Sequence, residues 1–280
     1  MKRIYIISLR KTYIYCTILA FLIIIGLVLF SKLFIADSLK ASAGDGAVLQ
    51  TGNGGKLAII IDDFGQNRSG VKEMMSIDRH MTFAVMPFLQ FSKDDAQMAH
   101  EKGFEVIAHL PLESNGGRLS WVGPKPILSS MLDEEITKIT KNALDDIPFA
   151  AGANIHMGSK AGSDVHVINA ILSLIKERNL YFVDSRSCNH PIAKGIADKM
   201  GVACLERNIF IDGKKPKSLI LDNLAKAQEM ALKKGKAIVI GHVGTEGGVI
   251  TAEAIREMLP EFDKNNVSLV YVSELLDRNQ

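Results

Sequence analysis

Short apolar runs alternate with longer amphipathic stretches along the chain from residue 56 onward. The short runs predict eight β-strands, at Leu57–Ile61, Met81–Met86, Phe104–Ala108, Ala150–Ile155, Leu180–Val183, Val202–Leu205, Ala237–Ile240 and Ser268–Val272. The stretches between them predict α-helices, at Lys93–Lys102, Asp133–Asp145, Val165–Arg178, Pro191–Met200, Leu219–Lys234 and Thr251–Lys264. Continuous apolar strands that alternate with helices are typical of a parallel sheet covered by helices. The pattern therefore predicts an α/β fold.

The number of strand and helix units narrows the architecture. Seven to eight units suit a distorted (β/α) barrel of mostly parallel strands, closed or nearly closed. A doubly wound open sheet is the alternative. In both architectures the functional site forms at the carboxyl ends of the strands. Polar residues that directly follow the apolar runs are therefore the candidates for chemistry.

The first apolar stretch is of a different kind. Residues 13–35 contain Lys32 as their only charge, and about 20 apolar residues suffice to span a bilayer. Residues 1–12 carry basic but no acidic side chains, which favours a cytoplasmic N-terminus. We therefore predict a transmembrane signal-anchor that holds the domain outside the cytoplasm, on the periplasmic side of the cytoplasmic membrane. A signal peptide cleaved near Ala43 would instead give a secreted or periplasmic protein.

The composition predicts a linker before the domain and argues against nucleic acid as a partner. Residues 36–55 are rich in Gly, Ala and Ser, which predicts a flexible linker and a folded domain at residues 56–280. Of the 33 basic residues, five lie in the first 35 positions, which leaves 28 basic against 31 acidic residues in the remainder. This balance gives no basic patch for nucleic acid. A disulfide between Cys188 and Cys204 stays open as an alternative to two free thiols.

Residues suited to catalysis or metal binding follow most of the predicted strands. They are the acid pair Asp62-Asp63, three histidines at His109, His156 and His242, and a polar group at Asp184, Arg186, Glu206 and Arg207. An acid pair before a glycine is also an ordinary turn, and a lone histidine is most often structural. Three histidines and an acid pair on one edge favour a metal site instead, because imidazole and carboxylate suit zinc or another divalent ion. Such an ion also offsets the repulsion between adjacent carboxylates.

The same residue types suit hydrolysis. A bound divalent ion lowers the pKa of water from about 15.7 towards 7 and polarises a carbonyl oxygen. A carboxylate that does not bind the ion can accept the water proton, and a histidine across the site can protonate the leaving group. The set therefore indicates hydrolysis of an amide or ester.

Six segments in order carry a resemblance to a known family: AIIIDDFG, EVIAHLPLE, GANIHMGS, YFVDSRS, LERNIFID and IVIGHVG. Together they resemble the divergent polysaccharide deacetylase family, a remote branch of the NodB-homology carbohydrate esterase superfamily, over about residues 56–276. The resemblance implies a distorted (β/α) barrel and a divalent metal, usually zinc. It also implies hydrolysis of N-acetyl groups on amino sugars, with a polysaccharide or peptidoglycan-like glycan as the substrate.

The resemblance further implies roles for single residues. Asp62 matches the catalytic base and His242 the general acid, while Asp63 and His109 match metal ligands. Three residues are expected around the substrate or behind the ligands: Asp184, Arg186 and Arg207. Arg207 either orients Asp62 or binds substrate, or else it forms a plain ion pair with Asp184 or Asp212.

The third ligand has two candidates. The family has a second histidine four positions after the first, where this chain has Glu113. Either Glu113 or His156 then completes the site, since carboxylate and imidazole both bind zinc. We prefer His156, with Glu113 as an alternative ligand or an orienting partner.

These expectations lead to one principal function and one alternative. The principal function is an extracytoplasmic metal-dependent hydrolase that removes N- or O-acetyl groups from polysaccharide, within carbohydrate metabolism of the cell envelope. The altered second motif leaves open a non-catalytic carbohydrate-binding or envelope-assembly domain with a degenerate metal site. Trp121, the only tryptophan, lies in a long loop after the second motif and either stacks on a sugar ring or anchors the loop.

Overall fold

The computed structural model describes residues 54–116, 118–213 and 216–276. The predicted cytoplasmic N-terminus, transmembrane anchor and nearly all of the predicted linker lie outside these residues. Among the described helices, none combines the length and the apolar composition that crossing a membrane requires.

The domain is built on one curled sheet in which every strand pairing is parallel. Its strands are β1 (Gly55–Phe64), β2 (Thr82–Val85), β3 (Glu105–Leu112), β4 (Ala150–Met157), β5 (Tyr181–Asp184), β6 (Cys204–Glu206), β7 (Ile209–Phe210), β8 (Lys236–His242) and β9 (Val267–Val270). Their order in the sheet is β6-β5-β4-β3-β2-β1-β8-β7, and β9 pairs with β1. The result is a half-barrel, in agreement with the prediction of a distorted barrel.

Strand β1 lies near the middle of the sheet and is the longest. It pairs with β8 over most of its length, with β9 along its first half and with β2 along its second half. Its apolar run from Leu57 to Ile61 is fully buried, which accounts for its continuous hydrophobic sequence.

The two edge strands are joined by only two residues. Strand β6 pairs with β5, and β7 pairs with β8 at the opposite edge. Arg207 and Asn208 connect them; the N–H of Arg207 donates to the carbonyl of Asp184, and that of Asn208 to the carbonyl of Ile238. Among the described residues no ladder joins β6 to β7, so this short crossing spans the open side of the half-barrel.

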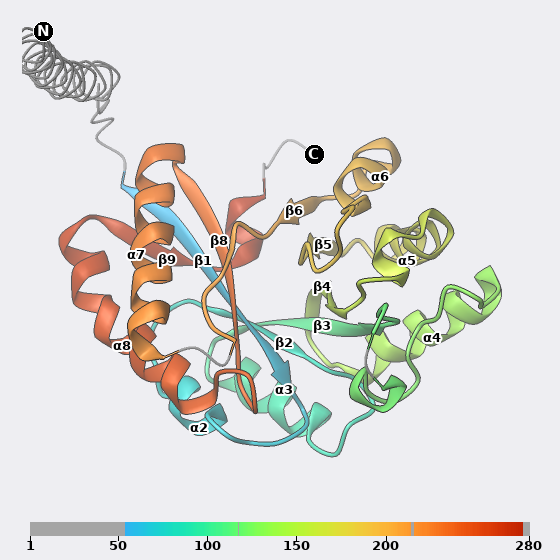
Figure 1. Cartoon of the computed structure of the whole chain (residues 1–280), viewed down its shortest axis with the longest axis horizontal. Coiled ribbons are helices and arrows are strands. Elements are labelled where there is room, and N and C mark those ends of the chain that lie inside the picture. The colour runs from blue at the N-terminus through green and yellow to red at the C-terminus, as the bar shows by residue number, and fades with distance from the viewer. Residues whose placement is uncertain (1–53, 117, 214–215, 277–280) are drawn as a thin grey trace, which may run out of the picture. The chain divides into compact units, whose positions relative to one another are not determined.

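Helices surround the outside of the sheet in chain order (Figure 1). They are α2 (Val71–Met74), α3 (Ser92–Glu101), α4 (Asp133–Asp146), α5 (Val165–Glu177), α6 (Ala193–Met200), α7 (Lys217–Lys234) and α8 (Gly248–Lys264). The described part of the chain also has three short 3-10 helices, η1 (Leu119–Trp121), η2 (Ala161–Ser163) and η3 (Val272–Leu275). The larger hydrophobic core lies between helices and sheet, and a smaller one lies inside the curl.

Alternation of side chains along the strands decides what faces the inside. Ala58 and Ile60 of β1, Ile107 of β3, and Ile238 and Ile240 of β8 belong to the inner core. Since successive strand residues point to opposite faces, the inner row of β1 continues to Asp62, that of β3 to His109 and that of β8 to His242. The apolar interior thus ends in polar residues at the carboxyl ends of the strands.

All eight predicted strands and all six predicted helices are present, with ends shifted by a few residues. Strand β7 and helix α2 were not predicted, because two and four residues are too short to show a hydrophobic period. Asp62, Asp63, His109 and His156 lie within the last residues of their strands rather than after them. Cys188 and Cys204 are free, so the alternative of a disulfide is not formed in this structure.

Candidate metal centre

A bulge at the end of β1 brings two adjacent carboxylates to the same site. The pairing of β1 with β2 shifts register between Ile61 and Phe64, and Asp63 has a φ of 71°, in the left-handed region. In a regular strand Asp63 would point outward when Asp62 points inward. A bulge adds a residue and turns its side chain, which lets both carboxylates reach the inner site, where both are buried.

Three donor atoms converge at this point. The Oδ1 of Asp63 lies 3.1 Å from the Nδ1 of His156 and 3.4 Å from the Nε2 of His109, and these two nitrogens are 3.2 Å apart. Ligands around a tetrahedral zinc ion with bonds of about 2.0 Å are separated by about 3.3 Å. The buried Oδ1 of Asp63 also has no hydrogen-bond donor of acceptable geometry, despite the two nitrogens beside it. The triangle therefore fits a metal ion, and these three residues could hold one.

Asn154 fixes the orientation of the first imidazole. It faces His109 across β3 and β4, and its Oδ1 lies 2.6 Å from the Nδ1 of His109. Its Nδ2 donates to the Oδ1 of Asp62 at 2.8 Å. An amide oxygen accepts, so Nδ1 of His109 carries the proton and Nε2 is left with a lone pair that faces the other donors, as in many metal-bound histidines.

Asp62 lies beside the three donors without being one of them. Its Oδ2 is 3.6 Å from the Nε2 of His109, and its strand partner on β8 is His242. Burial raises the pKa of Asp62, although the nearby His109 and His242 oppose that effect. The two acids therefore differ, because burial alone would raise the pKa of Asp63 as well, but His109 and His156 hold it well below its usual range.

His242 is held by an acid that follows β7, the strand beside it. Its Nδ1 lies 2.7 Å from the Oδ1 of Asp212, and its backbone N–H donates to the Oδ2 of Asp212 at 2.7 Å. Thr251 donates to the same Oδ2 at 2.7 Å. Burial would lower the pKa of His242, but the hydrogen bond and charge of Asp212 raise it to about 9. The Nδ1 of His242 is thus engaged by Asp212, and the raised pKa favours the protonated ring.

Several predicted residues lie outside the donor triangle. The Oε1 of Glu113 accepts from Lys160 at 2.9 Å and its Oε2 from the N–H of Ser129 at 3.0 Å, so the position where a second histidine was expected holds the backbone of a loop. Asp184 shares the outward row of Phe182 on β5, and its Oδ1 accepts the N–H of Arg186.

Arg207 packs on the aromatic ring that stacks against His242. Its guanidinium donates to the carbonyls of Ser185 and Arg186 at 2.6 and 3.1 Å and lies 3.6 Å from the centre of the Phe210 ring. The Phe210 ring in turn stacks on His242, with centroids 5.6 Å apart. Within the described residues, Arg207 forms no ion pair with Asp184 or Asp212.

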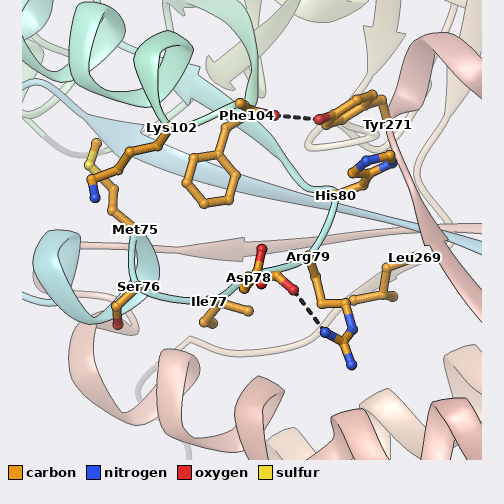
Figure 2. Close-up of a pocket in the computed structure, with 11 residues that line it drawn as sticks. Met75, Ser76, Ile77, Asp78, Arg79, His80, Lys102, Phe104, Leu269 and Tyr271 are labelled. Atoms are coloured by element: carbon orange, nitrogen blue, oxygen red, sulfur yellow. Dashed lines mark hydrogen bonds between the residues drawn. The ribbon is translucent and has the colours of Figure 1, made fainter.

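A pocket in the described residues lies away from these donors. It measures about 760 Å³ and opens before the amino ends of β2 and β3, lined by Ile77, Arg79, His80, Phe104 and Tyr271 among others (Figure 2). Its Arg79 is already paired with Asp263 at 2.9 Å and donates to the carbonyl of Asp78. The donor cluster, and not the size of this cavity, therefore marks the candidate site.

Solved structures of other proteins share the fold of this chain. A peptidoglycan N-acetylglucosamine deacetylase, Bc1960, matches with a TM-score of 0.50 at 12% identity, over 79% of this chain and 88% of that one. An uncharacterized protein, ATU2773, from Agrobacterium tumefaciens matches with a TM-score of 0.72 at 21% identity, over 80% and 89%.

The chain belongs to the divergent polysaccharide deacetylase family, which it matches over residues 59–276. Among curated relatives, the uncharacterized protein YibQ of Escherichia coli is 30% identical over 227 residues, which are 81% of this chain and 69% of that protein. The resemblance inferred from the six motifs is therefore confirmed.

Two residues of the site escaped the sequence analysis as site residues. Asn154 precedes His156 by two positions and so shares its face of β4, a signal that was present in the sequence. Asp212 follows β7, whose two residues give no strand pattern. Its role could not be assigned before the pairing of β7 with β8 was known.

We expect mutation to show that His156, and not Glu113, is the third metal donor. His156→Ala removes a donor from the triangle, and should weaken metal binding by more than the roughly 10- to 100-fold that loss of an outer partner costs. Glu113→Gln keeps the size of a side chain that lies outside the triangle, and should leave metal content unchanged. Elemental analysis of both purified variants checks this, and equal metal loss would contradict the assignment.

Proposed function

We propose that the domain is a metal-dependent hydrolase that removes acetyl groups from an N- or O-acetylated polysaccharide of the cell envelope. The observation that carries the proposal is the division between Asp63, His109 and His156, whose donor atoms converge, and Asp62 and His242, which flank them on neighbouring strands. We further propose that residues 13–35 anchor the chain in the cytoplasmic membrane, with the domain on its outer side.

The protein side chains divide the work of hydrolysis. A divalent ion, most simply zinc, would be held by Asp63, His109 and His156, and would supply a more acidic water and a polarised carbonyl. Asp62 accepts the proton of the attacking water. His242 donates a proton from Nε2 to the departing sugar nitrogen or oxygen. Water and the acetylated sugar thus give acetate and the free amine or alcohol.

Asn154 and Asp212 orient the proposed base, one ligand and the proposed acid. Asn154 holds Asp62 and His109 at once, so the base and one ligand share a single brace. Asp212 holds Nδ1 of His242 and leaves Nε2 for the substrate. The presence of a third donor in His156 supports the catalytic function over the alternative of a non-catalytic glycan-binding domain with a degenerate site.

Acetate release is the direct test. Protein beginning near Gly54, freed of metal by a chelator and reloaded with zinc, is incubated with N-acetylglucosamine oligomers and with O-acetylated xylan. We expect acetate release that disappears with the chelator and returns with the metal. A metal-replete protein that releases no acetate from either glycan would count against the proposal and favour the binding domain.

A further inference from the structure

The loop between β3 and α4, green in Figure 1, follows the strand that carries His109. It exposes two large apolar side chains. Trp121 is 62% exposed and Leu119 is 51% exposed, and both belong to the short helix η1. An exposed tryptophan next to an exposed leucine is unfavourable in water, because both leave apolar area unburied. Such a pair on a loop beside a site is a marker of ligand contact.

The exposure does not come from a loosely attached loop. Val122 and Ile127 are buried, and Ile127 bridges to Leu112 at the end of β3. The N–H of Ile127 donates to the carbonyl of Pro111 at 2.8 Å, and that of Glu113 to the carbonyl of Ile127 at 2.9 Å. The backbone that follows Trp121 is therefore anchored to the end of β3, while the Trp121 side chain is exposed.

The loop is fixed against the strand pair that carries a metal donor. A Cβ on Gly123 would lie 2.8 Å from Met86 and 4.0 Å from Pro111, so the chain passes directly over Pro111. Pro111 is the strand partner of His156. Only Val122 separates Trp121 from Gly123, which puts η1 at the rim of the site.

Glu113 joins this loop to the next one. Its side chain accepts from Ser129 in the loop and from Lys160 after β4, and its carbonyl accepts the N–H groups of Lys160 and Ala161. The residue that departs from the family pattern thus braces the loops leaving β3 and β4. Glu113 therefore has a structural role that does not involve the metal.

We propose that η1 is a sugar-stacking platform, on which Trp121 and Leu119 contact the apolar C–H face of a pyranose unit neighbouring the unit to be deacetylated. The inference rests on the proposed function and names the binding subsite that a polymer would need there. A glycan chain with one unit at the donors has to leave the site past its rim. An indole face offers a broad, rigid surface for a sugar ring at low cost in side-chain entropy.

The sequence supplies its own reporter for this platform. Trp121 is the only tryptophan in the 280 residues, so all tryptophan fluorescence of the protein reports on this position. We expect an N-acetylglucosamine tetramer to change the intensity or wavelength of that emission with a saturable dependence, and the monosaccharide to change it far less.

Kinetics of matched variants supply the second readout. Trp121→Ala should raise KM for the tetramer by about 3- to 10-fold, in line with the worth of one aromatic contact, while kcat changes less than twofold. Trp121→Phe should restore most of the affinity. Leu132→Ala is the control, because Leu132 is 70% exposed at the far end of the same loop and should leave KM unchanged.

The outcomes separate this inference from the proposed function. An active enzyme whose emission ignores the tetramer and whose KM is unaltered by Trp121→Ala would overturn the platform. Emission that responds to the tetramer without any acetate release would support the platform and contradict the hydrolase. Emission that responds to vesicles of anionic phospholipid but not to the tetramer would assign η1 to a membrane surface and overturn the inference.

Discussion

Replacing Asp62 by asparagine is expected to reduce acetate release by about 100- to 10,000-fold while the metal stays bound, the range typical for the loss of a positioned general base. Asp62 is buried beside the donor triangle, with its Oδ2 3.6 Å from the Nε2 of His109. The amide keeps an oxygen for the Nδ2 of Asn154 but cannot accept a proton from water. The rate of acetate release and the metal content of the same sample check the expectation together.

The neighbouring acid gives a matched control. Asp63→Asn makes the same chemical change one residue along, at a carboxylate that does belong to the triangle. We expect this variant to lose both metal and activity. If Asp62→Asn lost the metal as completely as Asp63→Asn, the two acids would share one role and the division between base and ligand would be wrong.

The hydrophobic pattern was sufficient to predict the sheet and most of the site. Every strand longer than two residues was visible as an apolar run, since a parallel sheet covered by helices buries both strand faces. The histidines were found because parallel strands end at one edge, so residues far apart in sequence had to meet there. His109, His156 and His242 follow this logic without any need for tertiary detail.

The structure was needed where side-chain direction departs from simple alternation. Regular alternation would send Asp63 outward, and only the bulge after Ile61, with its positive φ, turns it to the site. The opposite case is Asp184, which ends a strand as the others do but shares the outward row of Phe182. Position at a strand end was therefore a weaker criterion than position at a strand end on the inner row.

The place of Glu113 also required tertiary contacts. The spacing of Glu113 from His109 suggested a metal ligand. Nothing in the sequence indicated that its carboxylate would instead accept hydrogen bonds from Lys160 and Ser129. Because a carboxylate is equally able to bind a cation, a lysine or a backbone N–H, residue type alone could not separate these roles.

Replacing Asp212 by asparagine is expected to move the alkaline limit of activity towards lower pH. Burial would lower the pKa of His242, but the hydrogen bond and charge of Asp212, with smaller contributions from Asp62 and Asp63, raise it to about 9. A general acid acts only while it is protonated. Proton donation by His242 is therefore present below its pKa and is lost as pH rises through it. Without the carboxylate charge the pKa falls towards its ordinary value, so activity at pH 8 should drop much more than activity at pH 6.

The test compares the alkaline limit of activity in the wild-type protein and in Asp212→Asn. The difference is what matters, because a bound cation near His242 lowers the pKa of its imidazole in both proteins. The pH profile of kcat/KM should show a descending alkaline limb in both proteins, displaced to lower pH in Asp212→Asn. His242→Gln should remove that limb together with most of the activity. An unshifted limb in Asp212→Asn would mean that another group donates the proton, and that the pair formed by Asp212 and His242 serves only to hold β7 and β8 together.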